Sequence, residues 1–277
     1  MKIEIRYHKK CYCKCGESYC HDGETPPNVV NKIIYIVDFC FKKEYIIEMA
    51  KVAKQIIIID HHDTCFRQIE EMQFENVKII FDSEKSAAQL VWDFFYPGKT
   101  RPWFIDVIAD RDLWDMKLEN TGPLTRAMFK LGYYRWNMLE KLFKMDPDST
   151  IQNLLQIGIP IYESDRIEML KIASKAVKSI MTTPKGDVYN VYLVPCFNKM
   201  LKSDVGNYLA LKDCDFAVLW YYDFTEDSWW MSTRASRTCT LNLAEICEQF
   251  WMGGGHTKAA GFAIGNGENL HTYFEAI

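Results

Sequence analysis

The sequence has no long hydrophobic run and no signal for secretion. Its longest apolar stretches, residues 33–37 and 56–59, are far shorter than the about 20 residues that cross a bilayer. The charged start, residues 1–10, lacks the apolar core of a signal peptide. We therefore expect a cytoplasmic protein that does not engage a membrane.

An excess of basic residues is also missing. The 33 Lys and Arg residues stand against 37 Asp and Glu, which gives a formal net charge of −4. A protein that grips long duplex DNA neutralises many phosphates with a broad basic face, and this composition supplies none. A few local cations could still hold a short polyanion, so a small nucleotide or short oligonucleotide is the expected partner. A homodimer is compatible with these expectations.

Cysteine is plentiful but unevenly placed. Four of the ten cysteines fall within the first twenty residues, namely Cys11, Cys13, Cys15 and Cys20. Without a secretion signal they are expected to be reduced thiols. Histidine is scarce, and four of the six lie in the first 62 residues, namely His8, His21, His61 and His62.

The middle of the sequence alternates short apolar segments with helical patterns. Strands are predicted over residues 33–37, 56–59 and 77–81, and helices over residues 43–54, 64–71 and 86–95. Strands and helices in this alternation form a parallel sheet covered on both faces. We therefore predict an α/β domain over residues 1–148.

A long helical stretch leads from this domain into a second pattern. Residues 150–181 carry charges on one face and are predicted to form helix that could bridge two domains. Beyond residue 187, strands are predicted over 188–194, 216–222 and 229–234, with helices over 203–212 and 243–250. These patterns predict a helical linker over residues 149–185 and a smaller α+β domain over residues 186–277.

Acidic side chains follow two of the predicted strands directly. Asp38 and Asp60 each come at the carboxyl end of an apolar segment, which is where ligands bind in an open α/β sheet. An Asp after a strand is often only a turn former or a helix N-cap. However, packing gives no reason for two adjacent histidines, His61 and His62, on the same tight turn. The run Asp60-His61-His62 therefore favours a site for manganese, iron or magnesium.

Three successive glycines precede His256 near the C-terminal end. One glycine would be a simple helix C-cap, whereas three leave backbone N–H groups open to a ligand, as in phosphate-cradling loops. His256 could then contact a phosphate oxygen or help to protonate a leaving group. Arg234 could add a bidentate phosphate contact, although a lone arginine is more often a surface residue.

Four motifs, taken in order, carry a family resemblance. They are Tyr35-Ile36-Val37-Asp38, Ile58-Ile59-Asp60-His61-His62, Asp110-Arg111-Asp112-Leu113-Trp114, and Gly253-Gly254-Gly255-His256 with Ala259-Ala260-Gly261-Phe262. This set resembles the DHH phosphoesterase superfamily, in the branch that pairs the DHH domain with a DHH-associated domain carrying Gly-Gly-Gly-His. The branch includes RecJ-type exonucleases, nano-RNases that degrade short oligoribonucleotides and pAp, and cyclic-di-AMP phosphodiesterases. The resemblance covers residues 30–277 and implies an α/β parallel-sheet DHH domain joined by a helical linker to a smaller α+β domain.

The resemblance implies a phosphodiesterase that uses two manganese ions to activate water in a cleft between the domains. The metal ligands that it implies are Asp38, His61 and Asp110, with His8 from the first motif, and Asp22 is a candidate to complete that motif. It implies catalytic or supporting roles for Asp60, His62 and His256, and phosphate binding by Arg234, Gly254, Gly255 and His256. Related DHH proteins hydrolyse polyphosphate or pyrophosphate, but their usual second domain lacks the Gly-Gly-Gly-His motif.

The start of the chain departs from the family pattern. Family members have a strand, a histidine and then an aspartate, and here His8 fits but Cys13 stands where the aspartate is expected. Three hypotheses stay open. In the first, Asp22 completes a two-manganese site. In the second, the first metal site is lost, which leaves one metal or a catalytically impaired binding protein. In the third, the cysteines bind zinc in place of the missing elements of the first motif. The zinc ligands would be Cys11, Cys13, Cys15 and Cys20, and a plain cysteine-containing loop fits the same spacing.

Overall fold

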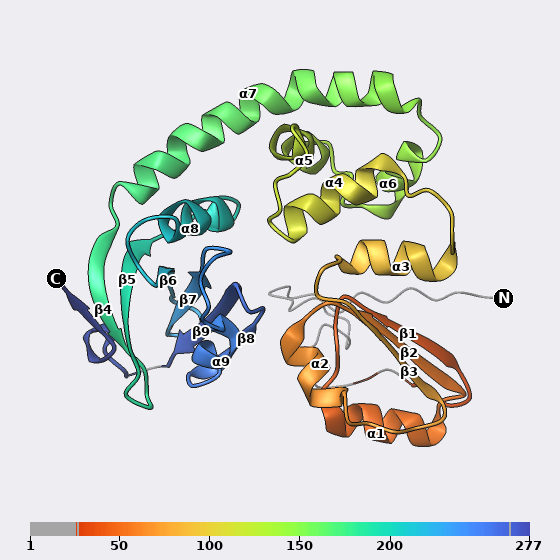
Figure 1. Ribbon diagram of the computed structural model, residues 1–277, viewed down its shortest axis with the longest axis horizontal. Coiled ribbons are helices and arrows are strands. Elements are labelled where there is room, and N and C mark those ends of the chain that lie inside the picture. The colour runs from red at the N-terminus through yellow and green to blue at the C-terminus, as the bar shows by residue number, and fades with distance from the viewer. Residues whose placement is uncertain (1–25, 27, 266) are drawn as a thin grey trace. The chain divides into compact units, whose positions relative to one another are not determined.

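The computed structural model describes residues 26, 28–265 and 267–277. The chain divides into two compact units (Figure 1). The first is the described part of Met1–Thr125 together with Leu131–Ile151, and the second is Arg126–Lys130 with Gln152–Ile277. Across the described ranges, no helix combines the length and the apolar character needed to cross a bilayer.

The first unit contains a parallel sheet of three strands. These are β1 (Ile33–Val37), β2 (Gln55–Asp60) and β3 (Val77–Phe81), in the order β1-β2-β3. The helices that alternate with them are α1 (Lys43–Val52), α2 (Asp63–Ile69) and α3 (Ala87–Phe95). The predicted α/β class and the parallel pairing are therefore confirmed.

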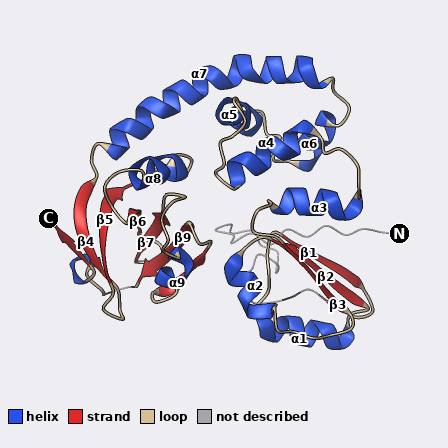
Figure 2. Cartoon of the chain, in the orientation of Figure 1, coloured by secondary structure: helices blue, strands red, loops and turns tan. Residues whose placement is uncertain are grey.

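Strand β2 is buried on both faces. Ile56 and Ile58 pack on one side in the core that contains Ile46 of α1, and Ile57 and Ile59 pack on the other side against α3. Helices α1 and α3 accordingly lie on opposite sides of the sheet (Figure 2). Burial of each isoleucine side chain contributes about 1.5–3 kcal/mol, so the end of β2 is held firmly in place.

Further helices complete this unit. They are α4 (Trp103–Asp112), α6 (Trp136–Leu142) and the first turns of α5 (Thr121–Lys130) and α7 (Pro147–Ala173). Helix α3 starts with a capping box in which the Ser86 side chain accepts from the backbone N–H of Gln89. The Gln89 amide then donates to Asp106 of α4 at 3.1 Å, which ties the two helices together.

The second unit is built on a mixed sheet of seven strands in the order β10-β4-β5-β6-β7-β9-β8. The strands are β4 (Val177–Thr182), β5 (Val188–Pro195), β6 (Phe216–Asp223), β7 (Ser228–Arg234), β8 (Trp251–Gly255), β9 (Ala259–Ile264) and β10 (Phe274–Ala276). The helices are α8 (Lys202–Ala210), α9 (Leu243–Cys247) and the short 3-10 helix η1 (Leu270–Thr272). Among the strands that the structure describes in this sheet, β5 and β6 run parallel, and the other neighbouring pairs are antiparallel.

Each face of this sheet is covered by its own helix. Val205 and Leu209 of α8 pack against Leu219 of β6, and Leu243 of α9 lies in the opposite core with Phe262 of β9. Alternate residues of the central strands therefore serve different cores, as the period of a β-strand requires.

Two predictions about secondary structure are wrong. The helix expected over residues 150–181 ends at Ala173, because Val177–Thr182 forms β4 and pairs with β5. In β4 the side chains of Ser179 and Met181, two residues apart, are both buried. Residues two apart share a face in a strand but point in nearly opposite directions in a helix. The glycine run expected as a loop lies within β8, at the edge of the sheet. The domain limits at residues 148 and 185 remain a prediction.

Candidate active site

Asp38 stands at the carboxyl end of β1. Its backbone N–H donates to the carbonyl oxygen of Ile59 at 3.0 Å, which extends the pairing of β1 with β2 by one step. Its φ is +55°, in the left-handed region that Asp and Asn tolerate better than other residues with a side chain. The side chain is 59% exposed, so its carboxylate is accessible at the edge that the sequence predicted.

Asp60 closes β2 and organises the turn that follows. Its Oδ1 accepts the backbone N–H of His61 at 2.7 Å and of His62 at 3.3 Å. The same oxygen lies 2.7 Å from Nδ1 of His62. Because an ionised carboxylate only accepts, Nδ1 carries the proton and Nε2 of His62 is the atom that can bind an ion or substrate. Asp60 thus both shapes the turn and orients His62.

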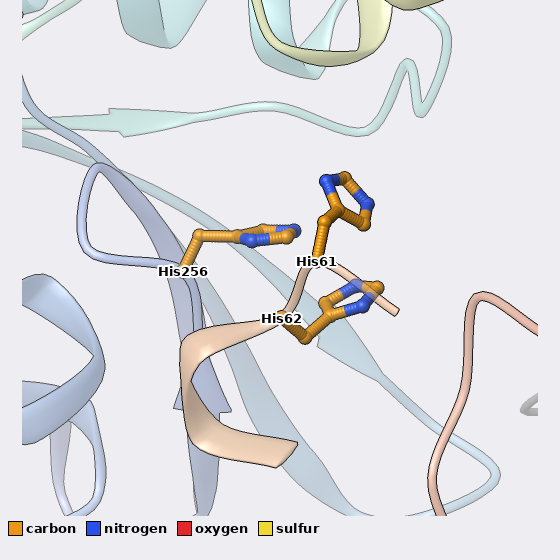
Figure 3. A group of neighbouring side chains, drawn as sticks. All are labelled: His61, His62 and His256. Carbon is orange, nitrogen blue, oxygen red and sulfur yellow. The ribbon is translucent and has the colours of Figure 1, made fainter. Parts of the chain in front are cut away.

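His61 is buried and faces two carboxylates. Its Nε2 lies 3.3 Å from Oδ1 of Asp38 and 3.5 Å from Oδ2 of Asp112, the last residue of α4. The rings of His61 and His62 meet edge to face, with centroids 4.8 Å apart, on the turn between β2 and α2 (Figure 3). These contacts bring together side chains from three separate segments of the first unit.

The charges of this cluster act on one another. Burial alone would lower the pKa of His62, but the hydrogen bond and charge of Asp60, with the charges of Asp38 and Asp112, raise it overall. Burial raises the pKa of Asp112, and the nearby Asp38 charge adds to this, while His61 and His62 oppose it. Carboxylates held this close repel one another, and a divalent cation among them would relieve that repulsion.

The cluster fits a divalent metal ion. One ligand atom from each of Asp38, Asp60, His61 and His62 lies within 4.8 Å of all the others. Two donors bound to one ion at about 2.0–2.2 Å stand about 3–3.5 Å apart. The distances of His61 Nε2 from Asp38 and Asp112, 3.3 and 3.5 Å, match that spacing. Carboxylate oxygen and imidazole nitrogen are donors that suit manganese, magnesium, iron and zinc.

Asp110, which the family resemblance implies as a ligand, has a different environment. It is 7% exposed, and its Oδ1 accepts the backbone N–H of Lys117 at 2.8 Å. Its Oδ2 accepts the backbone N–H of Leu118 at 3.1 Å and the hydroxyl of Thr121. The carboxylate therefore organises the loop between α4 and α5.

Asp112 is not among the site residues predicted from the sequence. It belongs to the same Asp-Arg-Asp motif as Asp110, and the structure places it beside His61. Residues two apart in a helix point in nearly opposite directions, so only one of the two carboxylates can face the sheet. The Asp-Arg-Asp motif could have indicated Asp112, because it contains both carboxylates.

In the second unit, three predicted phosphate-binding positions lie at one end of the sheet. Arg234 ends β7 and pairs with Ala259 of β9. Gly255 ends β8 and pairs with Ala260, the next residue of β9. His256 follows Gly255, and its backbone N–H donates to the carbonyl oxygen of Ala259 at 2.9 Å. The predicted residues thus lie at the end of β7 and at and just after the end of β8, the two strands that flank β9.

Close packing explains two of the three glycines. A Cβ at Gly253 would lie 1.6 Å from the carbonyl oxygen of Cys247, and one at Gly255 would lie 2.6 Å from Cα of Ala260. A Cβ at Gly254 would meet nothing within 4 Å, and its φ is +158°. Gly254 therefore leaves open space beside its backbone, and its part in a phosphate cradle stays a prediction.

The remaining predicted ligands lie outside the described residues. They are His8, Asp22, Cys11, Cys13, Cys15 and Cys20. The first metal motif and the zinc alternative accordingly stay predictions.

Comparisons with known proteins give one relative of uncharacterized function and several distant structural neighbours. No protein-family model matches the chain. It is 29% identical over 236 residues to uncharacterized protein R106 of Acanthamoeba polyphaga mimivirus, covering 84% of this chain and 53% of that protein. The chain thus spans about half the length of that relative.

The solved structures that match share little sequence with the chain. The pGpG-specific phosphodiesterase PggH from Vibrio cholerae is 15% identical, with 86% of this chain and 94% of that chain covered and a TM-score of 0.40. An exopolyphosphatase-related protein from Bacteroides fragilis is 16% identical, with 87% and 68% covered and a TM-score of 0.42. The α/β architecture and the cluster of Asp and His side chains, both expected from the sequence motifs, are present in this chain.

Proposed function

We propose that this chain is a metal-dependent phosphoesterase of the DHH type that hydrolyses short oligonucleotides or small nucleotides. The observation that carries the proposal is the convergence of Asp38, His61, His62 and Asp112 at the carboxyl ends of β1 and β2. The net charge of −4 favours small substrates over long duplex DNA.

In this proposal, Asp38, His61 and Asp112 hold a divalent ion, manganese in the first instance. Bound metal would lower the pKa of an attacking water and stabilise negative charge on the phosphoryl oxygens. Asp60 keeps the proton of His62 on Nδ1, so that Nε2 is presented to the ion or to the substrate. A second ion would take its further donors from the predicted first motif, His8 and Asp22.

Residues of the second unit would bind the phosphate of the substrate. Arg234 offers a planar fork of N–H groups that matches two phosphate oxygens. Gly254 leaves its backbone open to a ligand, and Gly255 lies next to it in β8. His256 would contact a phosphate oxygen or donate a proton to the leaving group.

A substrate panel tests the proposal. Purified protein is incubated with manganese and pAp, linear pGpG, cyclic dinucleotides, short RNA or pyrophosphate, and products are separated by chromatography. We expect hydrolysis of at least one nucleotide substrate, loss of that activity with EDTA, and no hydrolysis of pyrophosphate. No turnover of any nucleotide, with wild type indistinguishable from an Asp38→Asn variant, would refute the enzyme assignment.

A catalytically impaired nucleotide-binding protein is the second candidate. It rests on Cys13, which stands where the family has an aspartate. Calorimetric titration with the same panel distinguishes the two candidates, because tight binding without turnover would favour the second.

A further inference from the structure

The side chain of Arg234 lies against helix α8, on a surface formed by Ser203 and Gly206 that we call the seat of Arg234. Ser203 and Gly206 are three residues apart, so they share one face of the helix. The hydroxyl of Ser203 accepts from Nη2 of Arg234 at 3.0 Å. A Cβ at Gly206 would lie 2.6 Å from Cγ of Arg234 and 3.1 Å from its Cβ. The aliphatic stem of Arg234 therefore crosses the helix directly over Gly206.

The glycine at this position has a steric reason. Glycine inside a helix costs about 1 kcal/mol relative to alanine, so it is kept where something requires it. Gly206 is a buried residue of a regular helix, and it is not among the glycines with positive φ. The other atom close to its absent Cβ is Cδ1 of Leu219, at 2.7 Å, which is the end of a flexible side chain. The approach of Arg234 is thus what excludes a larger residue.

Helix α8 is itself anchored next to Ser203. Asp204 accepts from Nη2 of Arg126 at 2.8 Å, and Nε of Arg126 donates to Asp165 of α7 at 2.6 Å. Arg126 is only 6% exposed, so these ion pairs are screened little by solvent. The first turn of α8 is therefore fixed against α7, and the seat cannot shift freely under Arg234.

We propose that Ser203 and Gly206 are positioning residues that aim the guanidinium of Arg234 at the phosphate of the substrate. The inference rests on the proposed function, in which Arg234 binds that phosphate. Nη1 of Arg234 donates to the carbonyl oxygen of Thr233 at 2.7 Å, and Nη2 donates to Ser203, so both ends of the planar group are tied. Five N–H groups belong to a guanidinium, and a group fixed in orientation loses less freedom when it binds its ligand.

Steady-state kinetics of Ser203→Ala and Gly206→Ala test the inference on the best substrate of the panel. We expect KM to rise about tenfold in each variant, because a guanidinium that is no longer held in orientation loses more freedom when it binds the phosphate, while kcat changes less than about twofold. Ser203→Thr is the matched control, since it keeps the hydroxyl and should keep KM. In an Arg234→Ala background both substitutions should add nothing further. Unchanged KM in the single variants, or fully additive losses in that background, would overturn the inference.

A second readout needs no turnover. In protein labelled with 15N-arginine, the Nε–H resonance of Arg234 is identified by its loss in Arg234→Lys. We expect Ser203→Ala and Gly206→Ala to shift this resonance and to speed its exchange with water. An unchanged resonance would refute the seat even if the enzyme is active. A shifted resonance in a protein that hydrolyses no substrate would instead leave the seat intact and refute the proposed function. Ser203→Ala removes only one oxygen, so it decides the question if Gly206→Ala does not fold.

Discussion

Asp38→Asn is expected to lose metal-dependent hydrolysis by at least about 100-fold while the fold stays intact. Removal of residues that merely support metal ligands costs about 10–100-fold, so loss of a ligand carboxylate should cost at least the upper value. Asparagine tolerates the φ of +55° as aspartate does, and the side chain is 59% exposed. The free energy of unfolding should therefore change by less than about 0.5 kcal/mol. Turnover measures hydrolysis, manganese titration calorimetry measures metal affinity, which should fall with it, and chemical denaturation measures the free energy of unfolding.

The same chemical change at a remote position is the control for this prediction. Asp213→Asn alters a carboxylate that is 98% exposed. The structure describes an ion pair of this carboxylate with Lys178, which is itself exposed. Hydrolysis and manganese binding should be the same as in wild type. If Asp38→Asn binds manganese as tightly as this control, the cluster at the ends of β1 and β2 is not the metal centre.

The sequence allowed the position of this cluster to be predicted because the necessary information is local. Apolar segments of four or five residues ending in Asp38 and Asp60 specify strands whose polar residues come at their carboxyl ends. In a parallel sheet those ends meet at one edge, so proximity follows from chain order alone. The parallel register, which pairs Val37 with Ile59, bears this out.

Other features depend on contacts between distant segments, and the sequence does not reveal them. The seat of Arg234 joins residues 31 positions apart, and a glycine within a helical pattern gives no indication of which side chain crosses it. The sequence predicts helix where β4 forms, because the pairing of β4 with β5 and β10 decides its conformation more than its own propensity does. The glycines of β8 resemble a loop in sequence, yet their packing against Cys247 and Ala260 explains why two of them are glycine.

Which of Asp110 and Asp112 binds the metal ion also depends on contacts with distant segments. Substitution of Asp110 gives the largest expected change in stability. Asp110→Asn is expected to lower the free energy of unfolding by about 2–3 kcal/mol. The buried carboxylate accepts from the backbone N–H groups of Lys117 and Leu118 and from the hydroxyl of Thr121. An asparagine amide replaces one acceptor oxygen by an NH2 group, which would face these donors instead of accepting from them. Urea denaturation in the presence of EDTA measures the loss without a contribution from bound metal.

Asp112→Asn is the matched substitution, two residues away in the same helix, and it should give the opposite pattern. Its side chain is 48% exposed, and Oδ2 lies 3.5 Å from Nε2 of His61. We expect unfolding in EDTA to match wild type within about 0.5 kcal/mol, while manganese affinity and hydrolysis fall at least about tenfold. The converse result, with full manganese binding in Asp112→Asn and lost binding in a folded Asp110→Asn protein, would make Asp110 the ligand, as the motif resemblance implies. Because the two variants differ only in which carboxylate of one motif is changed, the pair separates a carboxylate that organises the α4–α5 loop from one that binds the ion.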